Sequence, residues 1–393
     1  MTKTLTEIAR DLKGSPKKVQ LIYAFNGTGK TRLSREFKEL LEAEIDTQDG
    51  DDTEASELSR KNILYYNAFT EDLFYWDNDL NGDEDRKLKI HPNAFTKWVL
   101  EDQGRGPAII DYFQRLTSSS IEPVFSPDYS YVTFKIPGSD EEPPIKISKG
   151  EESNFIWSVF YSFLELIIDE LGSAEDDRDE SFNGLKYIFI DDPVSSLDDN
   201  HLIELAVELA KLVKKSTYFE GNGLKFILTT HSPLFYNVLH NELNSDLEKP
   251  NPDGTQRWIY KRAQSEKYLL EKKGNDAFAL TKSNDRPFSY HLFLLSELRM
   301  AIHNNDIRKY HFNLLRNILE KTATFLGHGR WEILLPKLAD GSPDPFANRI
   351  LNLSSHSAHA GEEIAIIEDS DKDNLEALVS FLSSEYKFWK PEA

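Results

Sequence analysis

Cysteine is absent from the 393-residue sequence. Disulfides and thiolate metal sites are therefore excluded, and the chain suits a reducing compartment. Long apolar runs are absent too, since no stretch approaches the ~18 consecutive apolar residues that a membrane-spanning helix needs. Residues 1–14 are too polar for a signal peptide. We therefore expect a cytoplasmic protein with no membrane partner.

Positive charge is scarce, with 46 Lys and Arg against 67 Asp and Glu and a net charge of −21. Such a balance argues against nucleic-acid binding, because phosphate contacts depend on Lys and Arg. The charge is uneven, however. Residues 256–337 hold 15 Lys and Arg against 8 Asp and Glu, a local balance of +7 that leaves −28 for the rest of the chain. This basic segment is either a set of solvated helix faces or a nucleic-acid interface.

The N-terminal part of the chain alternates between strand and helix patterns. An apolar run at residues 21–24 leads through a Gly-rich turn into helical spacing at 31–41, and an apolar strand at 187–190 is followed by a helix at 201–213 and a strand at 225–228. This alternation predicts an α/β domain with a parallel sheet flanked by helices.

Other segments add an antiparallel region and a second domain. Residues 129–136 and 145–147 have the pattern of a hairpin, followed by a helix at 154–170. Residues 244–255 contain two prolines and a glycine and are typical of a linker or long turn, and beyond about residue 288 the pattern is purely helical. We predict domains at 1–263 and 264–393.

The segment Ala24–Thr31 lies between the first strand and the first long helix, where a phosphate-binding loop belongs. Its backbone amides can surround phosphates, Lys30 can reach the β and γ oxygens, and Thr31 can ligate Mg²⁺. Ala24 replaces the usual first glycine. The predicted nucleotide contacts from this loop are Asn26, Gly27, Thr28, Gly29, Lys30 and Thr31.

Two carboxylates, Asp191 and Asp192, end the apolar strand at 187–190. Buried carboxylates are costly without partners such as a metal. We predict that Asp191 binds the magnesium together with Thr31, and that Asp192 faces the attacking water.

Three further motifs resemble those of ABC ATPases of the DNA-repair and defence branch. Asp198 closes a D-loop-like segment, and His231 resembles the switch histidine that senses the γ-phosphate. The signature-like segment 147–153 supplies Ser148, Gly150 and Glu151, although a serine before a helix can also be a simple cap. No glutamine stands at the expected Q-loop position, for which Asn67 is a candidate without a motif of its own. The resemblance implies self-association into a head-to-tail dimer or higher oligomer, in which two heads enclose two nucleotides.

In the C-terminal part, Arg316 and Glu320 are four residues apart and share one helix face. Taken alone, this spacing is typical of an ordinary salt bridge. Further on, His356 and His359 lie in a turn of small residues.

With these residues in view, the sequence resembles the PrrC anticodon nuclease family over essentially its whole length. The resemblance rests on segments 19–36, 63–80, 148–161, 187–207 and 314–327, and Ala24 is normal in that family. It implies a C-terminal all-α, HEPN-like nuclease domain with a tRNA-recognition region at its start. It also implies that Arg316, Glu320 and His356 are the nuclease residues, and that tRNA-Lys is cut 5′ of the wobble base.

The resemblance carries further expectations. The products are a 2′,3′-cyclic phosphate and a 5′-hydroxyl, and the head uses Mg²⁺ with GTP or ATP, with dTTP as a possible stabilising ligand. The family consists of antiviral toxins held silent by a type I DNA restriction-modification enzyme. Residues 282–287 are short relative to the family's tRNA-recognition segment, a departure that bears on anticodon preference.

Metal-free chemistry suits these residues. Attack of a 2′-hydroxyl on the adjacent phosphate needs a base, an acid and a cation. Glu320 or His356 can be the base and the acid, Arg316 can contact the phosphate, and His359 is the spare histidine. Unpaired bases can stack on aromatics such as Phe288, Tyr290 or Trp331.

Two other functional classes compete with this one. A RecF-like or SMC-like DNA-repair clamp explains the nucleotide motifs but leaves Arg316, Glu320 and His356 without a role. A non-enzymatic adaptor would use the helical domain only to bind a restriction enzyme.

Overall fold

The structure is a computed structural model, and it forms two compact units. The head unit is Met1–Pro287 and the C-terminal unit is Phe288–Ala393. The described residues are 2–45, 63–66, 74–76, 86–91, 100–101, 103–138, 143–173, 182, 184–193, 199–219, 222–250, 256–283, 288–337, 339, 341, 367 and 369–388.

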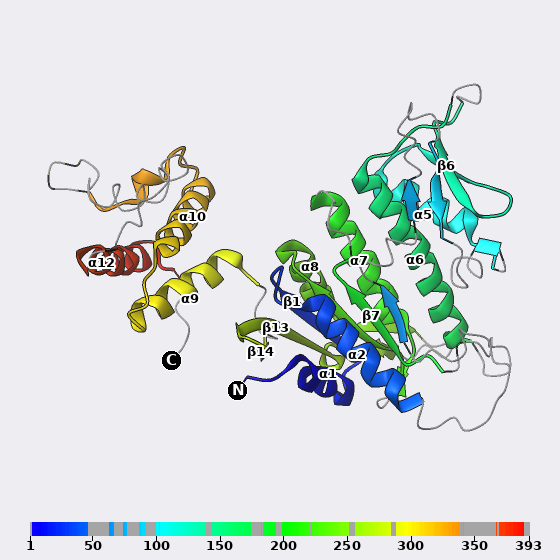
Figure 1. The fold of residues 1–393 in the computed structure, drawn as a ribbon, viewed down its shortest axis with the longest axis horizontal. Coiled ribbons are helices and arrows are strands. Elements are labelled where there is room, and N and C mark those ends of the chain that lie inside the picture. The colour runs from blue at the N-terminus through cyan, green and yellow to red at the C-terminus, as the bar shows by residue number, and fades with distance from the viewer. Residues whose placement is uncertain are drawn as a thin grey trace. The chain divides into compact units, whose positions relative to one another are not determined.

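A six-stranded sheet forms the centre of the head unit (Figure 1). Its strand order is β14-β13-β1-β10-β7-β2, and all neighbours are parallel except β13 and β14. Every residue of β1 and β7 is buried, which is expected of a parallel sheet covered on both faces. The strands are β1 (Val19–Ala24), β2 (Ile63–Tyr66), β7 (Tyr187–Asp191), β10 (Lys225–Thr230), β13 (Ser265–Gly274) and β14 (Ala277–Lys282).

Helices cover both faces of this sheet. Helices α1 (Leu5–Gly14) and α2 (Lys30–Ile45) share a core with Ile22 and Ala24 of β1. Because side chains alternate along a strand, Tyr23 points to the opposite face, where its ring meets Tyr236 of α8 (Pro233–Leu243). Helix α8 packs in turn on α7 (Asp199–Lys215). The α/β prediction for this domain is confirmed.

A second, antiparallel sheet of order β3-β4-β6-β5 extends the head unit, together with α5 (Gly106–Thr117) and α6 (Lys149–Gly172). The predicted hairpin is only partly right, because β6 pairs with β4 and β5, and residues 145–147 add a single bridge from Ile145 to Phe134. The strands are β3 (Phe74–Trp76), β4 (Leu88–Ile90), β5 (Glu122–Phe125) and β6 (Tyr131–Lys135).

The segment predicted as a linker, 244–255, is not a simple connection. Strand β11 (Leu247–Pro250) pairs antiparallel with β12 (Gln256–Tyr260), so Pro250 is the last residue of a strand, whereas Pro252 and Gly254 lie outside the described residues. A short turn of 3-10 helix, η4 (Arg262–Gln264), leads from this hairpin into β13. A further pair of two-residue strands, β8 (Tyr218–Phe219) and β9 (Asn222–Gly223), follows α7.

The described part of the C-terminal unit is helical, as predicted. Its elements are α9 (Tyr290–His303), α10 (Lys309–Phe325), the 3-10 helix η5 (Trp331–Leu334) and α12 (Asp369–Glu385). They enclose one apolar core, which includes Leu298 of α9, Leu319 of α10, Leu334 of η5 and Leu375 of α12. No helix of the described residues is long and apolar enough to cross a membrane.

The boundary between the units lies later than the sequence prediction placed it. We predicted a boundary after Ala263, but β13 pairs with β1 from Val19–Ser265 to Ala24–Leu270, and β14 pairs with β13. Both strands therefore complete the central sheet, and the head unit extends to Pro287.

This boundary can be tested by truncation. A chain that ends at Ala263 loses the strand that covers one edge of β1, together with the buried side chains of Leu270 and Phe278. We expect it to show no cooperative thermal unfolding by circular dichroism, whereas a chain that ends at Pro287 unfolds cooperatively. Equal melting curves for the two chains would mean that β13 and β14 do not belong to the head.

Candidate functional site

The loop between β1 and α2 has a backbone that requires its glycines. Gly27 has φ +76° and Gly29 has φ +103°, both in the left-handed region that other residues rarely adopt. A side chain at Gly29 would also come within 3.4 Å of Leu5 and 3.6 Å of Phe278. The loop leads directly into α2, whose first turn starts with the bond from Leu33 N to Gly29 O at 2.9 Å. A helix N-terminus reached through such a loop is a natural anion site.

The side chain of Lys30 folds back over this loop. Its Nζ donates to Ala24 O at 3.3 Å and to Asn26 Oδ1 at 3.2 Å, and it stands 3.4 Å from Asp192 Oδ2. The side chain is buried. The ammonium group is thus held among oxygen atoms beside the loop, where it can neutralise phosphate oxygens.

Asp191 is almost fully buried at the end of β7. Its Oδ2 accepts a hydrogen bond from Thr31 Oγ1 at 2.8 Å, and its Oδ1 accepts one from Thr229 Oγ1. Burial raises the pKa of Asp191, although the two hydroxyl groups act in the opposite direction. The structure thus brings Thr31 and Asp191 together, as expected for a magnesium site.

These two residues fit Mg²⁺ when a nucleotide supplies further ligands. Magnesium prefers oxygen ligands and usually binds through one or two protein groups, water and substrate phosphates. Among the described residues, no group of three or more His, Asp or Glu could hold a metal ion. A metal at Thr31 and Asp191 would take further ligands from phosphate oxygens and water.

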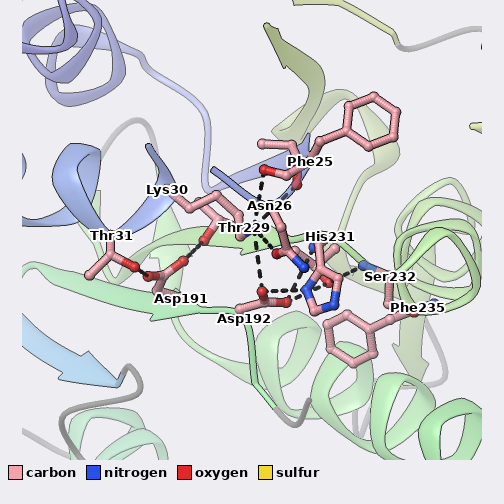
Figure 2. A network of polar contacts seen from close by, with 12 residues as sticks. Phe25, Asn26, Lys30, Thr31, Asp191, Asp192, Thr229, His231, Ser232 and Phe235 are labelled. Atoms are coloured by element: carbon pink, nitrogen blue, oxygen red, sulfur yellow. Dashed lines mark hydrogen bonds and ion pairs between the residues drawn. The ribbon is translucent and has the colours of Figure 1, made fainter. Parts of the chain in front are cut away.

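Asp192 is bonded differently from its neighbour (Figure 2). Its Oδ1 accepts from Thr230 Oγ1 and from the His231 amide, each at 3.2 Å, while Oδ2 contacts His231 Nδ1 and Lys30. Burial alone would raise the pKa of Asp192, but the His231 hydrogen bond and the Lys30 charge outweigh it and lower the pKa. Two adjacent carboxylates thus have pKa values moved in opposite directions, which suits different roles.

His231 lies between β10 and α8. The next residue, Ser232, caps α8 by accepting a hydrogen bond from Phe235 N at 3.2 Å. The imidazole is about one-third exposed, at 31%, so it borders solvent beside Asp192 and Lys30. The predicted residues Lys30, Thr31, Asp191, Asp192 and His231 therefore form one polar network. Their individual roles stay predictions.

The signature-like residues lie outside this network. Ser148 is the N-cap of α6, and it forms a capping box with Glu151, with bonds of 2.7 and 3.2 Å. Figure 1 shows the start of α6 well apart from the start of α2 within the head unit. Ser148, Gly150 and Glu151 therefore do not complete the site of their own chain. Asp198 and Asn67 lie outside the described residues.

The C-terminal unit brings Arg316 and Glu320 together. Arg316 Nε donates to Glu320 Oε1 at 2.8 Å, and the Arg316 guanidinium lies 5.8 Å from the centre of the Trp331 ring. The two side chains are 32% and 50% exposed, so the pair lies at the surface with access to a ligand. His356 and His359 lie outside the described residues.

Sequence reasoning missed some supporting residues. Thr229 bonds to Asp191 and Thr230 bonds to Asp192, so both strand-end hydroxyls hold the carboxylates in place. The only sequence signal was that these threonines immediately precede His231. Nothing in the sequence indicates the contact between Trp331 and Arg316, because it joins helix α10 to the later 3-10 helix η5.

A glycine-containing phosphate loop beside two adjacent carboxylates at the end of a buried parallel strand defines a P-loop nucleoside triphosphatase head. Comparisons with known proteins show which family this head belongs to. A family model described as "AAA domain" matches residues 131–384. A curated protein named "Anticodon nuclease" from Escherichia coli is 47% identical over 419 aligned residues, which span 100% of this chain and 99% of that one.

The chain belongs to the AAA-domain family and, within it, to the PrrC-type anticodon nucleases. Among solved structures, the crystal structure of an SMC head bound to the C-winged helix domain of ScpA aligns with 68% of this chain and 90% of that chain. The TM-score of this alignment is 0.30, and the sequence identity is 10%.

Replacing Lys30 tests the nucleotide site. We expect Lys30→Ala to lower hydrolysis of ATP and GTP by at least about 10²-fold, because a fixed positive charge next to the phosphates is removed. Asp192→Asn should retain bound nucleotide but hydrolyse it slowly. Lys38→Ala, which changes an exposed lysine of the same helix, is the matched control. Parent-like hydrolysis by the Lys30 variant would show that the phosphate loop is wrongly assigned.

The raised pKa of Asp191 predicts how magnesium-dependent nucleotide binding responds to pH. A protonated carboxyl group cannot ligate Mg²⁺, so affinity should fall on acidification at a pH above 3.8, the ordinary Asp pKa. Asp192→Asn removes a neighbouring negative charge that raises the Asp191 pKa, so it should move this loss to lower pH. Thr229→Val removes a hydrogen bond that lowers the pKa and should move the loss to higher pH.

The measurement is calorimetric titration of each variant with a non-hydrolysable nucleotide and Mg²⁺ between about pH 4 and pH 8. This range begins near the ordinary Asp pKa of about 3.9 and therefore covers a raised one. Circular dichroism at each pH serves as the control for folding. Superimposable profiles for the parent and both variants would contradict the role given to Asp191.

Proposed function

We propose that this chain is a nucleotide-regulated anticodon nuclease that cleaves tRNA-Lys in the anticodon loop, 5′ of the wobble base. The observation that carries the proposal is the similarity to a curated anticodon nuclease over the full length of both chains. Both the nucleotide head and the C-terminal unit are therefore shared with that relative. The products would be a 2′,3′-cyclic phosphate and a 5′-hydroxyl.

The cleavage step needs only groups of the chain and the RNA. The 2′-oxygen bonds to the adjacent phosphorus while the bond from phosphorus to the 5′-oxygen breaks. The 2′-hydroxyl proton passes to Glu320 or His356, and the other of these two groups gives a proton to the leaving 5′-oxygen. Arg316, held by Glu320 and Trp331, would neutralise the charge on the phosphate oxygens. This step is metal-independent.

The head would regulate this reaction through GTP or ATP bound with Mg²⁺, with dTTP as a possible stabilising ligand. Lys30, Thr31 and Asp191 would hold the phosphates and the metal, while Asp192 and His231 would respond to the γ-phosphate. The capped start of α6 lies apart from this site in the same chain. This supports a head-to-tail assembly in which Ser148, Gly150, Glu151 and Asp198 complete the partner's site.

The biological setting follows from the family. We propose a cytoplasmic antiviral toxin, held inactive by a type I restriction-modification enzyme, whose C-terminal unit is a HEPN-like nuclease domain. The helical character of that unit supports the last point. Its tRNA contacts would come from residues 288–337, the part of the basic segment that lies in this unit, with aromatic side chains such as Phe288, Tyr290 and Trp331 available for unpaired bases.

The DNA-repair clamp and the adaptor are less well supported. Both account for the nucleotide network of the head, which P-loop proteins of many functions share. Neither gives a role to the surface pair of Arg316 and Glu320, and neither explains the similarity to an anticodon nuclease along the whole chain.

The nuclease residues can be tested one at a time. We expect Arg316→Ala, Glu320→Ala and His356→Ala each to lower tRNA cleavage by about 10²–10⁴-fold, the usual cost of removing a general acid or base. Folding and nucleotide hydrolysis should be unchanged, because an exposed ion pair contributes under about 1 kcal/mol. The measurement is single-turnover cleavage of an anticodon stem-loop.

Two controls accompany these variants. Lys372→Ala breaks another exposed ion pair of the same unit, with Asp369, and should cleave at the parent rate. His359→Ala distinguishes the two histidines, and loss of cleavage there beside an active His356 variant would reassign the role. Parent-like cleavage by the Arg316 and Glu320 variants would reduce that pair to an ordinary salt bridge.

A further inference from the structure

Phe325 is the most exposed large apolar side chain among the described residues. Its relative exposure is 89%, and the next most exposed, Tyr310, is at 49%. Phe325 is the last residue of α10, a helix whose other face is packed into the core of the C-terminal unit. Single apolar residues at a surface are common. A function for Phe325 therefore has to be argued from the residues around it.

The backbone that carries Phe325 is fixed. Gly327 adopts φ +78°, its amide donates to Thr324 O at 3.1 Å, and the His328 amide donates to Ala323 O at 2.8 Å. These two bonds form a Schellman motif, which satisfies the last carbonyl groups of the helix. Ala323 is buried in the core. The Phe325 ring is therefore presented to solvent from a well-anchored helix end rather than from a loose loop.

Cationic side chains lie close to Phe325 in the sequence. Residues 321–331 contain Lys321, His328 and Arg330, while Glu320 and Glu332 flank this segment and Glu332 pairs with Arg330 at 3.4 Å. Residues 324–330 are all exposed. Lys321 lies one helical turn before Phe325, on the same face of α10. An exposed ring beside cationic side chains is a combination that binds single-stranded nucleic acid, by stacking on bases and attraction to phosphates.

The position along α10 relates Phe325 to the pair of Arg316 and Glu320. Glu320 and Phe325 are five residues apart, a rise of ~7.5 Å along the helix and, at 3.6 residues per turn, a rotation of ~140° around its axis. Phe325 therefore lies further along α10 and on a different face from Arg316 and Glu320. A base on Phe325 would thus belong to a different nucleotide of the loop from the one whose phosphate reacts at that pair.

We propose that Phe325 is a stacking platform for one unpaired base of the RNA loop that the C-terminal unit cleaves, with Lys321 and Arg330 contacting the neighbouring phosphates. The proposal rests on the proposed nuclease function and deepens it. Because a ring face stacks on any base, Phe325 selects unpaired over paired nucleotides rather than one sequence. The adjacent bases within a duplex are stacked on each other and cannot occupy it.

The test compares Phe325→Leu with Phe325→Trp in the full-length protein. Leucine keeps the apolar character and removes the ring, whereas tryptophan keeps an aromatic face. The probe is a fluorescent anticodon stem-loop with a 2′-deoxy nucleotide at the cut position, which cannot be cleaved. At one fixed salt concentration, we expect the leucine variant to bind about tenfold more weakly, the usual effect of losing one stacked base. The tryptophan variant should bind like the parent.

Three further readouts separate stacking from a structural role. Thermal stability should be equal in all variants, because the side chain is 89% exposed. With cleavable RNA, Phe325→Leu should raise KM and leave kcat near the parent value, since the base is held equally in the ground and transition states. Tyr310→Leu, at the second most exposed ring of the same helix, is the matched control and should bind like the parent.

Parent-like affinity of the leucine variant would overturn the proposal and leave the nuclease function intact. A changed oligomeric state at unchanged RNA affinity would overturn it too, since Phe325 would then contact protein. An equal loss of affinity for a fully paired duplex would exclude base stacking. If the parent itself binds no anticodon stem-loop, the nuclease function fails, and that result is recognisable because it does not depend on residue 325.

Discussion

The nucleotide site depends on one electrostatic constraint, the placement of two adjacent carboxylates at the end of a buried strand. Asp191 is satisfied by hydroxyl groups from Thr31 and Thr229, and burial raises its pKa. Asp192 is held by His231 and Lys30, which lower its pKa. Without these partners, a buried Asp191 and a half-buried Asp192 would be costly. Strands β1, β10 and β7 are neighbours in the sheet, so the residues at and after their carboxyl ends, which include all of these partners, lie close together.

The same contacts tie the site to the helices around it. Thr31 belongs to the first turn of α2, and His231 directly precedes the Ser232 cap of α8. A nucleotide that displaces Lys30 or His231 from Asp192 would therefore act on the starts of two helices that cover opposite faces of the sheet. The proposed regulation by the γ-phosphate would act through these two helix starts.

Local patterns predicted the core of the head well, and distant pairings account for most of the errors. The phosphate loop, β7 and β10 follow from apolar runs and turn residues that are close in sequence. Strand β13 was missed because it pairs with β1 across the whole domain, from Ser265 to Val19, and its charged residues hide its burial. Arg316 and Glu320 could be paired by their spacing, whereas nothing local could indicate the contact between Arg316 and Trp331.

The central claim is that one chain joins a nucleoside triphosphatase head to a nuclease for the anticodon loop. The most direct measurement is to incubate the purified protein with total tRNA, Mg²⁺ and GTP or ATP, and to sequence the new RNA ends. The account predicts that tRNA-Lys is cut 5′ of the wobble base, with 2′,3′-cyclic phosphate ends that require nucleotide. Intact tRNA in a preparation that hydrolyses nucleotide normally would contradict it.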